Sequence, residues 1–162
     1  VLEWDWRTYP PGYFDIIWAS PDCTHYSRAK TVGRRKLTFA DKMVVKTLKI
    51  IDDLQPRIWI MENPETGLLK KRDFMLLRPR AIVDYCQYGL PYRKRTALWS
   101  NISTELVQIL KLCKYDCEFS CNGRHFTSVQ EAFHGKERGQ IPLPLLFDIF
   151  NLCARLIEED VV

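Results

Sequence analysis

The sequence predicts an α/β protein built on part of a doubly wound, Rossmann-like sheet that is mostly parallel and ends in an antiparallel hairpin. Two apolar segments, 14–19 and 57–61, show no alternation of polar and apolar residues, which is typical of strands buried on both faces of a parallel sheet. A helical pattern lies between them. Two further strand-like segments, 82–86 and 96–99, are too close in the chain for a helix to connect them. Strands that alternate with helices in this way build layered α/β folds.

The helices are predicted from the spacing of apolar residues. The first covers 37–54, where apolar residues recur every three or four positions until Pro56. Shorter helices are expected at 68–77 and 103–112. The last helix opens at Pro144. Its apolar face consists of Leu145, Ile149, Leu152, Cys153 and Leu156.

Length and composition are those of an ordinary globular protein. The chain has 162 residues, of which 46% are hydrophobic and 27% charged, and this excludes a disordered, collagenous or disulfide-stabilised miniprotein. No apolar run reaches the roughly 20 residues that cross a bilayer, and no signal segment opens the sequence, so we expect a cytoplasmic protein with no membrane partner. The six cysteines are therefore expected to be reduced thiols rather than disulfides.

The positive charge is concentrated at one expected edge of the sheet. In open α/β sheets, binding sites form beyond the carboxyl ends of the strands. The basic residues at these ends are Arg28, Lys30, Arg34, Arg35 and Lys36 after the first strand, Lys70, Lys71 and Arg72 after the second, and Arg93, Lys94 and Arg95 between the last two. A basic edge with interspersed aromatic residues suits a polyanion such as nucleic acid, although solvated loop charges would give the same pattern.

Two of these strand ends also carry reactive side chains. Cys23 lies in segment 20–27 (Ser-Pro-Asp-Cys-Thr-His-Tyr-Ser). The nearby His25 and Arg28 could favour its thiolate through their positive charge. The alternative is an inert cysteine in a loop. Glu62 ends the second strand, which should lie beside the first. A buried carboxylate there is costly unless it serves as an acid or a hydrogen-bonding group. With a pair of arginines, these residues would combine a nucleophile, an acid and an anion-binding group.

The residues at these strand ends resemble three motifs of the DNA (cytosine-5) methyltransferases. Segment 20–27 is similar to the Pro-Cys nucleophile loop of that family, and Glu62-Asn63-Pro64 to its Glu-Asn-Val motif. Segment 89–95 (Gly-Leu-Pro-Tyr-Arg-Lys-Arg) is similar to its Gly-x-Pro-Gln-x-Arg-x-Arg segment. The motifs occur in the family's order and at suitable spacing. The resemblance therefore implies transfer of a methyl group from S-adenosylmethionine to C5 of cytosine in double-stranded DNA.

The resemblance also implies a role for each matching residue. Cys23 would add to C6 of a cytosine flipped out of the duplex, and Glu62 would contact its N3 and exocyclic amine. Arg93 and Arg95 would hold the base and the catalytic loop, and the basic loop 24–36 would close over the flipped nucleotide. The residues expected against the cofactor are Ser20 and Pro21, and those expected to contact DNA are Ser27, Arg28, Lys30, Arg34, Arg35, Asn63, Pro64 and Arg124.

The sequence departs from the family pattern at several places. Asp22 stands where the family usually has Pro, Tyr92 stands at or beside the usual Gln, and the Arg-x-Arg spacing is one residue short. The family's Gly-rich cofactor turn is absent from the sequence. We therefore expect the carboxyl-terminal part of a catalytic domain, completed by a preceding segment or a second chain, with little turnover in isolation. A catalytically silent nucleic-acid-binding homologue and an RNA cytosine-5 methyltransferase are the alternatives.

Three parts are predicted: a catalytic half-domain at 1–100, a target-recognition region at 101–139, and a carboxyl-terminal helix at 140–162 that packs back on the first part. The small recognition region is typical of a viral or bacterial modification enzyme, as in restriction-modification. It contains four candidate zinc ligands, Cys113, Cys117, Cys121 and His125. Their uniform spacing is unusual for a zinc finger, so free thiols in a loop-rich subdomain are the alternative.

Overall fold

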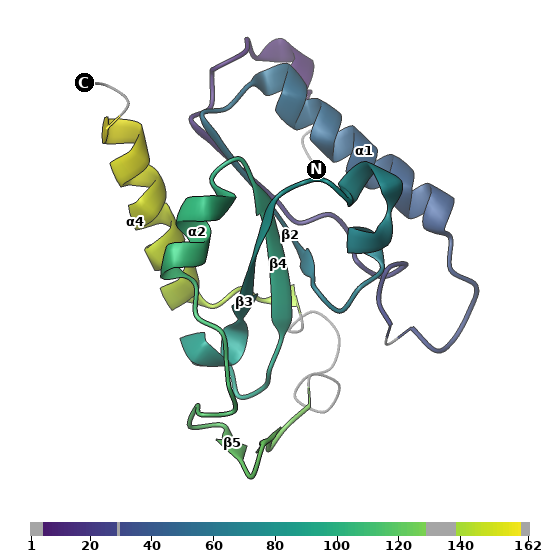
Figure 1. Ribbon diagram of the computed structural model, residues 1–162. Coiled ribbons are helices and arrows are strands. Elements are labelled where there is room, and N and C mark those ends of the chain that lie inside the picture. Colours follow the sequence, from purple (N-terminus) through teal and green to yellow (C-terminus); the bar gives the residue numbers. More distant parts are fainter. Residues whose placement is uncertain (1–4, 29, 129–138, 160–162) are drawn as a thin grey trace.

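A four-stranded sheet forms the centre of the computed structural model, which describes residues 5–28, 30–128 and 139–159 (Figure 1). The strands are β1 (Ile16–Ala19), β2 (Ile58–Pro64), β3 (Arg80–Asp84) and β4 (Arg95–Ser100), in the spatial order β1-β2-β4-β3. β1 and β2 are parallel, whereas β4 is antiparallel to both of its neighbours, β2 and β3. The carboxyl ends of β1 and β2 therefore meet at one edge of the sheet.

The sheet is mixed, and the expectation of a mostly parallel sheet is not confirmed. The predicted antiparallel hairpin is present, but β4 inserts between β3 and β2, which adds a second antiparallel pairing. The sequence also predicts burial of the first strand on both faces. In the structure β1 is an edge strand, and its four residues are only half-buried. Central β4 is almost entirely buried instead.

Helix α1 (Leu37–Leu54) covers one face of the sheet. Its buried residues recur at the predicted helical spacing, and Ala40, Val44 and Leu48 pack in one cluster with Met61 and Trp99 of the sheet. The helix ends at Gln55, whose left-handed φ of 44° lets its N–H donate to the carbonyl of Ile51 at 3.0 Å. The prediction of this helix is confirmed.

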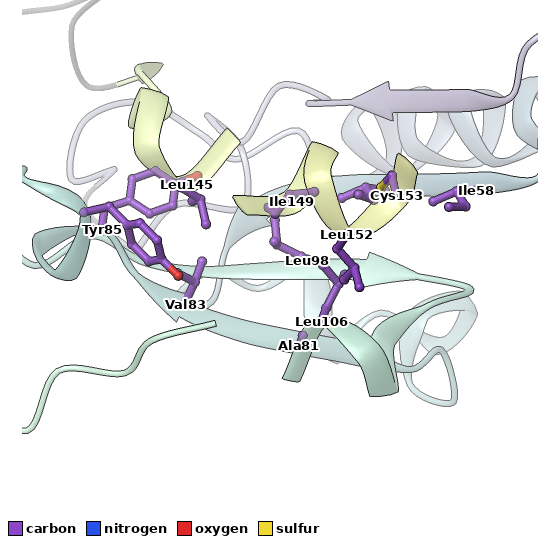
Figure 2. Packing of buried hydrophobic residues seen from close by; sticks show 12 residues of the cluster. Ile58, Ala81, Val83, Tyr85, Leu98, Leu106, Leu145, Ile149, Leu152 and Cys153 are labelled. Carbon is purple, nitrogen blue, oxygen red and sulfur yellow. The ribbon is translucent and has the colours of Figure 1, made fainter. Parts of the chain in front are cut away.

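Helices α2 (Ser103–Ile109) and α4 (Leu143–Glu159) cover the opposite face (Figure 1). Figure 2 shows the apolar face of α4 against residues of β3, β4 and α2, with Leu145 and Ile149 fully buried. Burial of one such side chain contributes roughly 1.5–3 kcal/mol. The end of α4 is also held by Arg57, which donates to the carbonyl of Ile157 at 2.7 Å. The predicted last helix is confirmed, with its apolar face inward.

Short elements complete the described chain. They are the 3-10 helices η1 (Trp6–Thr8), η2 (Leu69–Lys71), η3 (Asp73–Met75) and η4 (Tyr85–Tyr88), and the two-residue strands β5 (Ser120–Cys121) and β6 (Arg124–His125). The basic helix predicted at 68–77 is wrong, because Arg72 adopts an extended backbone between η2 and η3 and pairs with Asp41 of α1. The helix predicted to reach 112 ends at Ile109. Among the described helices, none is long and apolar enough to cross a membrane.

Candidate active site

Cys23 lies in a tight turn just beyond β1. Its carbonyl accepts hydrogen bonds from the backbone N–H groups of Tyr26 and Ser27, both at 2.9 Å. Asp22 closes the start of the turn, because its Oδ1 accepts from the N–H of Thr24 at 2.9 Å and from the Thr24 hydroxyl at 2.6 Å. Asp22 thus has a structural role at the position where the family usually carries proline. The Cys23 side chain is left half-buried.

Tyr26 anchors this turn to the rest of the protein. Its side chain is fully buried, and its hydroxyl donates to Oδ1 of Asp41 at 2.8 Å. Asp41 in turn accepts from Arg72, at 2.6 and 3.0 Å. Burial and the bond to Asp41 raise the pKa of Tyr26, so the phenol stays a neutral donor. No sequence motif marks this anchor. The only signal for it in the sequence is a lone tyrosine within a polar loop.

The parallel pairing of β1 and β2 brings the Glu-Asn-Pro segment to the Cys23 turn. Ala19, the last residue of β1, lies opposite Met61, whereas β2 continues to Pro64 in pairing with β4. Glu62 and Asn63 therefore lie next to the residues that follow β1. Asn63 is fully buried, and its Nδ2 donates to the carbonyl of Pro21 at 2.9 Å. The structure therefore joins two of the three predicted motifs directly.

Glu62 is buried, with 7% of its surface exposed, and it is paired. Its Oε1 accepts from the hydroxyl of Tyr85 at 3.2 Å and lies 3.6 Å from Nζ of Lys94. Lys94 is itself buried, and its ammonium group stands 4.8 Å from the centre of the Tyr85 ring. A carboxylate out of water needs such partners, because an unpaired buried charge is costly.

Lys94 is the main residue of this site that sequence reasoning missed. The structure brings Lys94, and not Arg93, to Glu62. The alternation of side chains along β4 was the available signal. Leu98 faces the cluster that contains Tyr85, and side chains two and four residues earlier, at Thr96 and Lys94, are expected on the same face of the sheet.

The two predicted arginines lie beside Lys94 with different partners. Arg93 forms a two-pronged ion pair with the fully buried Asp84, at 3.1 and 3.2 Å, and donates to the hydroxyl of Tyr115 at 2.8 Å. This pairing raises the pKa of Arg93. Arg95 begins β4, is half-buried, and accepts at its carbonyl from the N–H of Glu65 at 3.0 Å. Their roles in holding the base stay predictions.

The electrostatics at Cys23 differ from the expectation. Burial raises the pKa of the Cys23 thiol, the negative charges of Glu62 and Asp22 raise it further, and Lys94 acts in the opposite direction. The hypothesis that nearby basic residues of the loop favour the thiolate is therefore wrong for this state. His25 is engaged instead as an acceptor, since its Nδ1 receives the N–H of Lys36 at 3.2 Å.

The loop between the Cys23 turn and α1 carries most of the residues expected to contact DNA. Arg28, Arg34 and Arg35 are exposed, and Lys30 is half-buried. Arg35 donates to the carbonyls of Ser27 and Lys30, at 3.0 and 3.2 Å, so it holds the loop conformation. Contact of these residues with DNA stays a prediction, as does contact by Pro64 and the exposed Arg124.

The described residues do not enclose a site for S-adenosylmethionine. The exposed Ser20 accepts from the indole N–H of Trp18 at 3.0 Å, and the carbonyl of Pro21 is taken by Asn63. β1 next to them is an edge strand, and within the described residues no further strand lies on its outer side. Neither the cavity along α1, with Lys46 and Phe74, nor the cavity near Leu90 is lined by Ser20 or Cys23. Ser20 and Pro21 would therefore form at most one wall of a cofactor site.

Three of the four predicted zinc ligands come together, and the fourth, Cys121, lies outside their cluster. Cys113, Cys117 and His125 form a cluster, which the buried Cys86 of η4 completes. Cys121 is exposed. On the β5–β6 hairpin, Cys121 is paired with Arg124 and His125 with Ser120, so Cys121 and His125 point to opposite faces. Spacing along the sequence does not point to Cys86, because it is distant in the chain from the other cysteines and ends the strand predicted at 82–86.

An α/β fold that sets a cysteine turn beside a paired glutamate has the arrangement of a site for covalent catalysis. No protein-family model matches the chain. The chain is 31% identical over 181 residues to the probable DNA (cytosine-5)-methyltransferase of Frog virus 3 (isolate Goorha), and the match covers 94% of this chain and 82% of the viral protein. The chain belongs to the DNA (cytosine-5)-methyltransferase family, which confirms the resemblance predicted from the three motifs.

Proposed function

We propose that this chain carries the base-activating part of a DNA (cytosine-5)-methyltransferase, with Cys23 as the nucleophile and Glu62 as the group that holds the cytosine. The observation that carries the proposal is the junction of the two motifs through the bond from Asn63 to Pro21, at 2.9 Å. The viral relative is a probable DNA (cytosine-5)-methyltransferase, which supports DNA cytosine as the substrate. Family membership of the whole chain favours an enzyme over a catalytically silent homologue.

Cys23 would activate the base by covalent addition. The Sγ lone pair forms a bond to C6 of the cytosine, and the electron pair of the C5–C6 double bond moves to C5, which then becomes nucleophilic. Loss of the C5 proton after methyl transfer would return the pair and release Cys23. The target base must first leave the duplex, at a cost of a few kcal/mol.

Glu62 would recognise the edge of the flipped base and control the nucleophile. Cytosine offers an acceptor at N3 and a donor at N4, so a carboxyl group facing both can accept from N4 and share a proton with N3. The negative charge of Glu62 contributes to the raised pKa of Cys23. Sharing that charge with a proton would therefore favour the thiolate once the correct base is bound. Lys94 and Tyr85 would hold the carboxyl group in place, through the contacts at Oε1.

The methyl donor would need residues beyond those that the structure describes. The donor would be held mainly by a glycine-rich segment, from a preceding part of the protein or from a second chain, with Ser20 and Pro21 forming one wall. The contribution of this chain is then the attack on C6, which can be measured without the donor.

The test is a covalent trap on duplex DNA that contains 5-azacytosine. Attack at C6 places the electron pair on the ring nitrogen at position 5, which takes a proton, and the adduct accumulates because the electron-poor triazine ring favours addition more than cytosine does. We expect an adduct with the wild-type chain and with Cys121→Ser, which removes an exposed cysteine outside the site. Cys23→Ser should give none. Absence of a wild-type adduct, or equal trapping by Cys23→Ser, overturns the proposal.

Two further substrates separate the remaining alternatives. An RNA duplex with 5-azacytosine should trap much less protein than the DNA duplex; the reverse preference would favour the RNA methyltransferase alternative. DNA with 5-fluorocytosine gives a stable adduct only after methyl transfer, because fluorine cannot leave C5 as the proton does. We expect no such adduct from this chain with S-adenosylmethionine alone, and an adduct here would contradict the need for a second part.

A further inference from the structure

We propose that Cys86, Cys113, Cys117 and His125 form a structural zinc site. Their ligand atoms all lie within 4.8 Å of one another, and they come from three separate segments of the chain. The set includes Cys86 from η4 and excludes Cys121. The site is separate from the cluster around Cys23 and Glu62, and its existence does not depend on methyl transfer.

The distances among three of the four ligands are close to those of a tetrahedral metal centre, and the fourth ligand, Cys86, lies within 4.8 Å of them. Sγ of Cys113 is 3.7 Å from Sγ of Cys117, and Nε2 of His125 is 3.6 Å from the first sulfur and 3.2 Å from the second. Ligands placed about 2.3 Å (sulfur) and 2.0–2.1 Å (nitrogen) from a tetrahedral Zn²⁺ lie about 3.4–3.8 Å from each other. The sulfur pair is far from the about 2.05 Å of a disulfide bond, and all the cysteines are free.

The ligand chemistry selects zinc. Three thiolates and one imidazole form a closed, soft, four-ligand set, which is typical of structural zinc sites and leaves no open position for catalysis. Magnesium and calcium prefer oxygen ligands in larger numbers. Cys86 and Cys113 are buried and the other two ligands are half-buried, so a metal here would be shielded from water.

The surroundings of the cluster are organised as those of a metal site. The N–H of Tyr115 donates to Sγ of Cys113 at 3.2 Å, and the Ser120 hydroxyl donates to the carbonyl of Cys117 at 3.0 Å. The first bond orients a thiolate as the outer shell of a metal site does, and the second holds the backbone of the neighbouring ligand. Tyr115 holds a left-handed backbone with φ of 66°, which is unfavourable for an aromatic residue and needs a surrounding structure that imposes it.

A metal would also explain how a hairpin as short as β5–β6 keeps its conformation. Each strand has two residues, joined by a tight turn at Asn122 and Gly123 with φ values of 51° and 75°. A hairpin this short is at best marginally stable in water by itself. In Figure 1 it lies beyond the turn that joins β3 and β4, away from the helices. Coordination by His125 would fasten it to η4.

The zinc site would connect the recognition segment to the catalytic side of the sheet. Cys86 directly follows Tyr85, which donates to Glu62 at 3.2 Å. Next to the cluster, the N–H of Cys113 donates to Oδ2 of Asp84 at 3.0 Å, and Arg93 bridges Asp84 and Tyr115. Zinc would therefore fix the base of the segment that carries Arg124.

The test is the metal content of the purified chain and of two matched variants. We expect one zinc per chain for the wild type by atomic spectroscopy, and the same for Cys121→Ser, which removes the ligand that spacing alone predicts. Cys86→Ser should lower zinc affinity by more than the roughly 10- to 100-fold typical of losing an outer-shell partner. Cys153→Ser controls for loss of a buried thiol, because Cys153 lies in the core outside the cluster.

Cobalt substitution adds a readout of the ligand set. The wild type loaded with Co²⁺ should show the intense visible bands of a tetrahedral centre and thiolate-to-cobalt charge-transfer bands. Cys117→Ser should lose part of the charge-transfer intensity, and this variant serves if Cys86→Ser does not fold. A folded wild type that binds no zinc overturns the proposal. So does a Cys121→Ser variant that loses zinc while Cys86→Ser keeps it.

Discussion

Glu62 raises the pKa of the Cys23 thiol through its negative charge, and this links the group that would recognise the base to the group that would attack it. The link predicts that Glu62→Gln makes Cys23 more reactive toward a simple alkylating agent but less able to trap cytosine. Removing the carboxylate lowers the pKa of Cys23, so the thiolate fraction rises at a given pH.

The measurement is the rate of alkylation of Cys23 by iodoacetamide across a pH series, followed by peptide mass spectrometry. The midpoint for the wild type should lie above that of an ordinary thiol, and the midpoint for Glu62→Gln should lie lower. Alkylation of the exposed Cys121 in the same samples is the internal control and should not respond to the substitution. Unchanged midpoints for Cys23 would contradict the coupling.

Lys94 is expected to stabilise the fold by neutralising Glu62. Lys94→Met keeps the length of the side chain but leaves a buried carboxylate without its cation, which should lower the free energy of unfolding by about 3 kcal/mol. The double variant Glu62→Gln/Lys94→Met should recover most of this loss, because no buried charge is left. Urea unfolding of the four proteins measures the coupling, and additive losses would show that the two side chains do not interact.

At the scale of elements, the buried bond from Tyr26 to Asp41 connects the Cys23 turn to α1. Tyr26→Phe removes one hydrogen bond to a carboxylate and should cost about 1.5–3 kcal/mol of stability. We expect slower formation of the 5-azacytosine adduct as well, because the turn loses its anchor. Tyr13→Phe, at an exposed tyrosine, is the control and should change neither quantity. Normal trapping by a destabilised Tyr26→Phe would show that the anchor serves stability alone.

The elements themselves were largely predictable, because long apolar periodicities determine them. The regular spacing from Leu37 to Leu54 and the apolar face that begins at Leu145 each identify a helix without tertiary information. The short elements were not predictable. Segment 68–77 has the composition of a helix, but the pairing of Arg72 with Asp41, distant in sequence, divides it into two 3-10 turns.

Residues of the candidate site that belong to a sequence motif could be predicted. Residues that reach the site only through contacts between distant parts of the chain could not. Cys23 and Glu62 were found from their motifs and from the rule that sites form at strand ends. Lys94 was missed because the motif pointed to its neighbours, and only the alternation of β4 directs it toward Glu62. Cys86 was missed because a metal cluster depends on tertiary proximity, whereas spacing along the chain pointed to Cys121.

At the scale of the whole molecule, one sheet carries the two sets of functional side chains at separate places. The parallel pair β1–β2 presents the Cys23 turn and Glu62, while η4, the segment between α2 and β5, and β6 hold the proposed zinc ligands. The residues just before β4 connect them, because Lys94 meets Glu62 and the adjacent Arg93 meets Asp84. The insertion of β4 between β2 and β3 is therefore the feature that brings base activation and the Cys-rich segment together.

The identity of the atom that attacks cytosine tests this account most directly. The wild-type chain is incubated with duplex DNA containing 5-azacytosine, the covalent complex is digested with a protease and a nuclease, and the modified peptide is sequenced by mass spectrometry. If Cys23 is the nucleophile and Glu62 its partner, a single modified residue, Cys23, is expected, and both Cys23→Ser and Glu62→Gln should lose the adduct. A modification on another cysteine, or an adduct that survives Cys23→Ser, would contradict it.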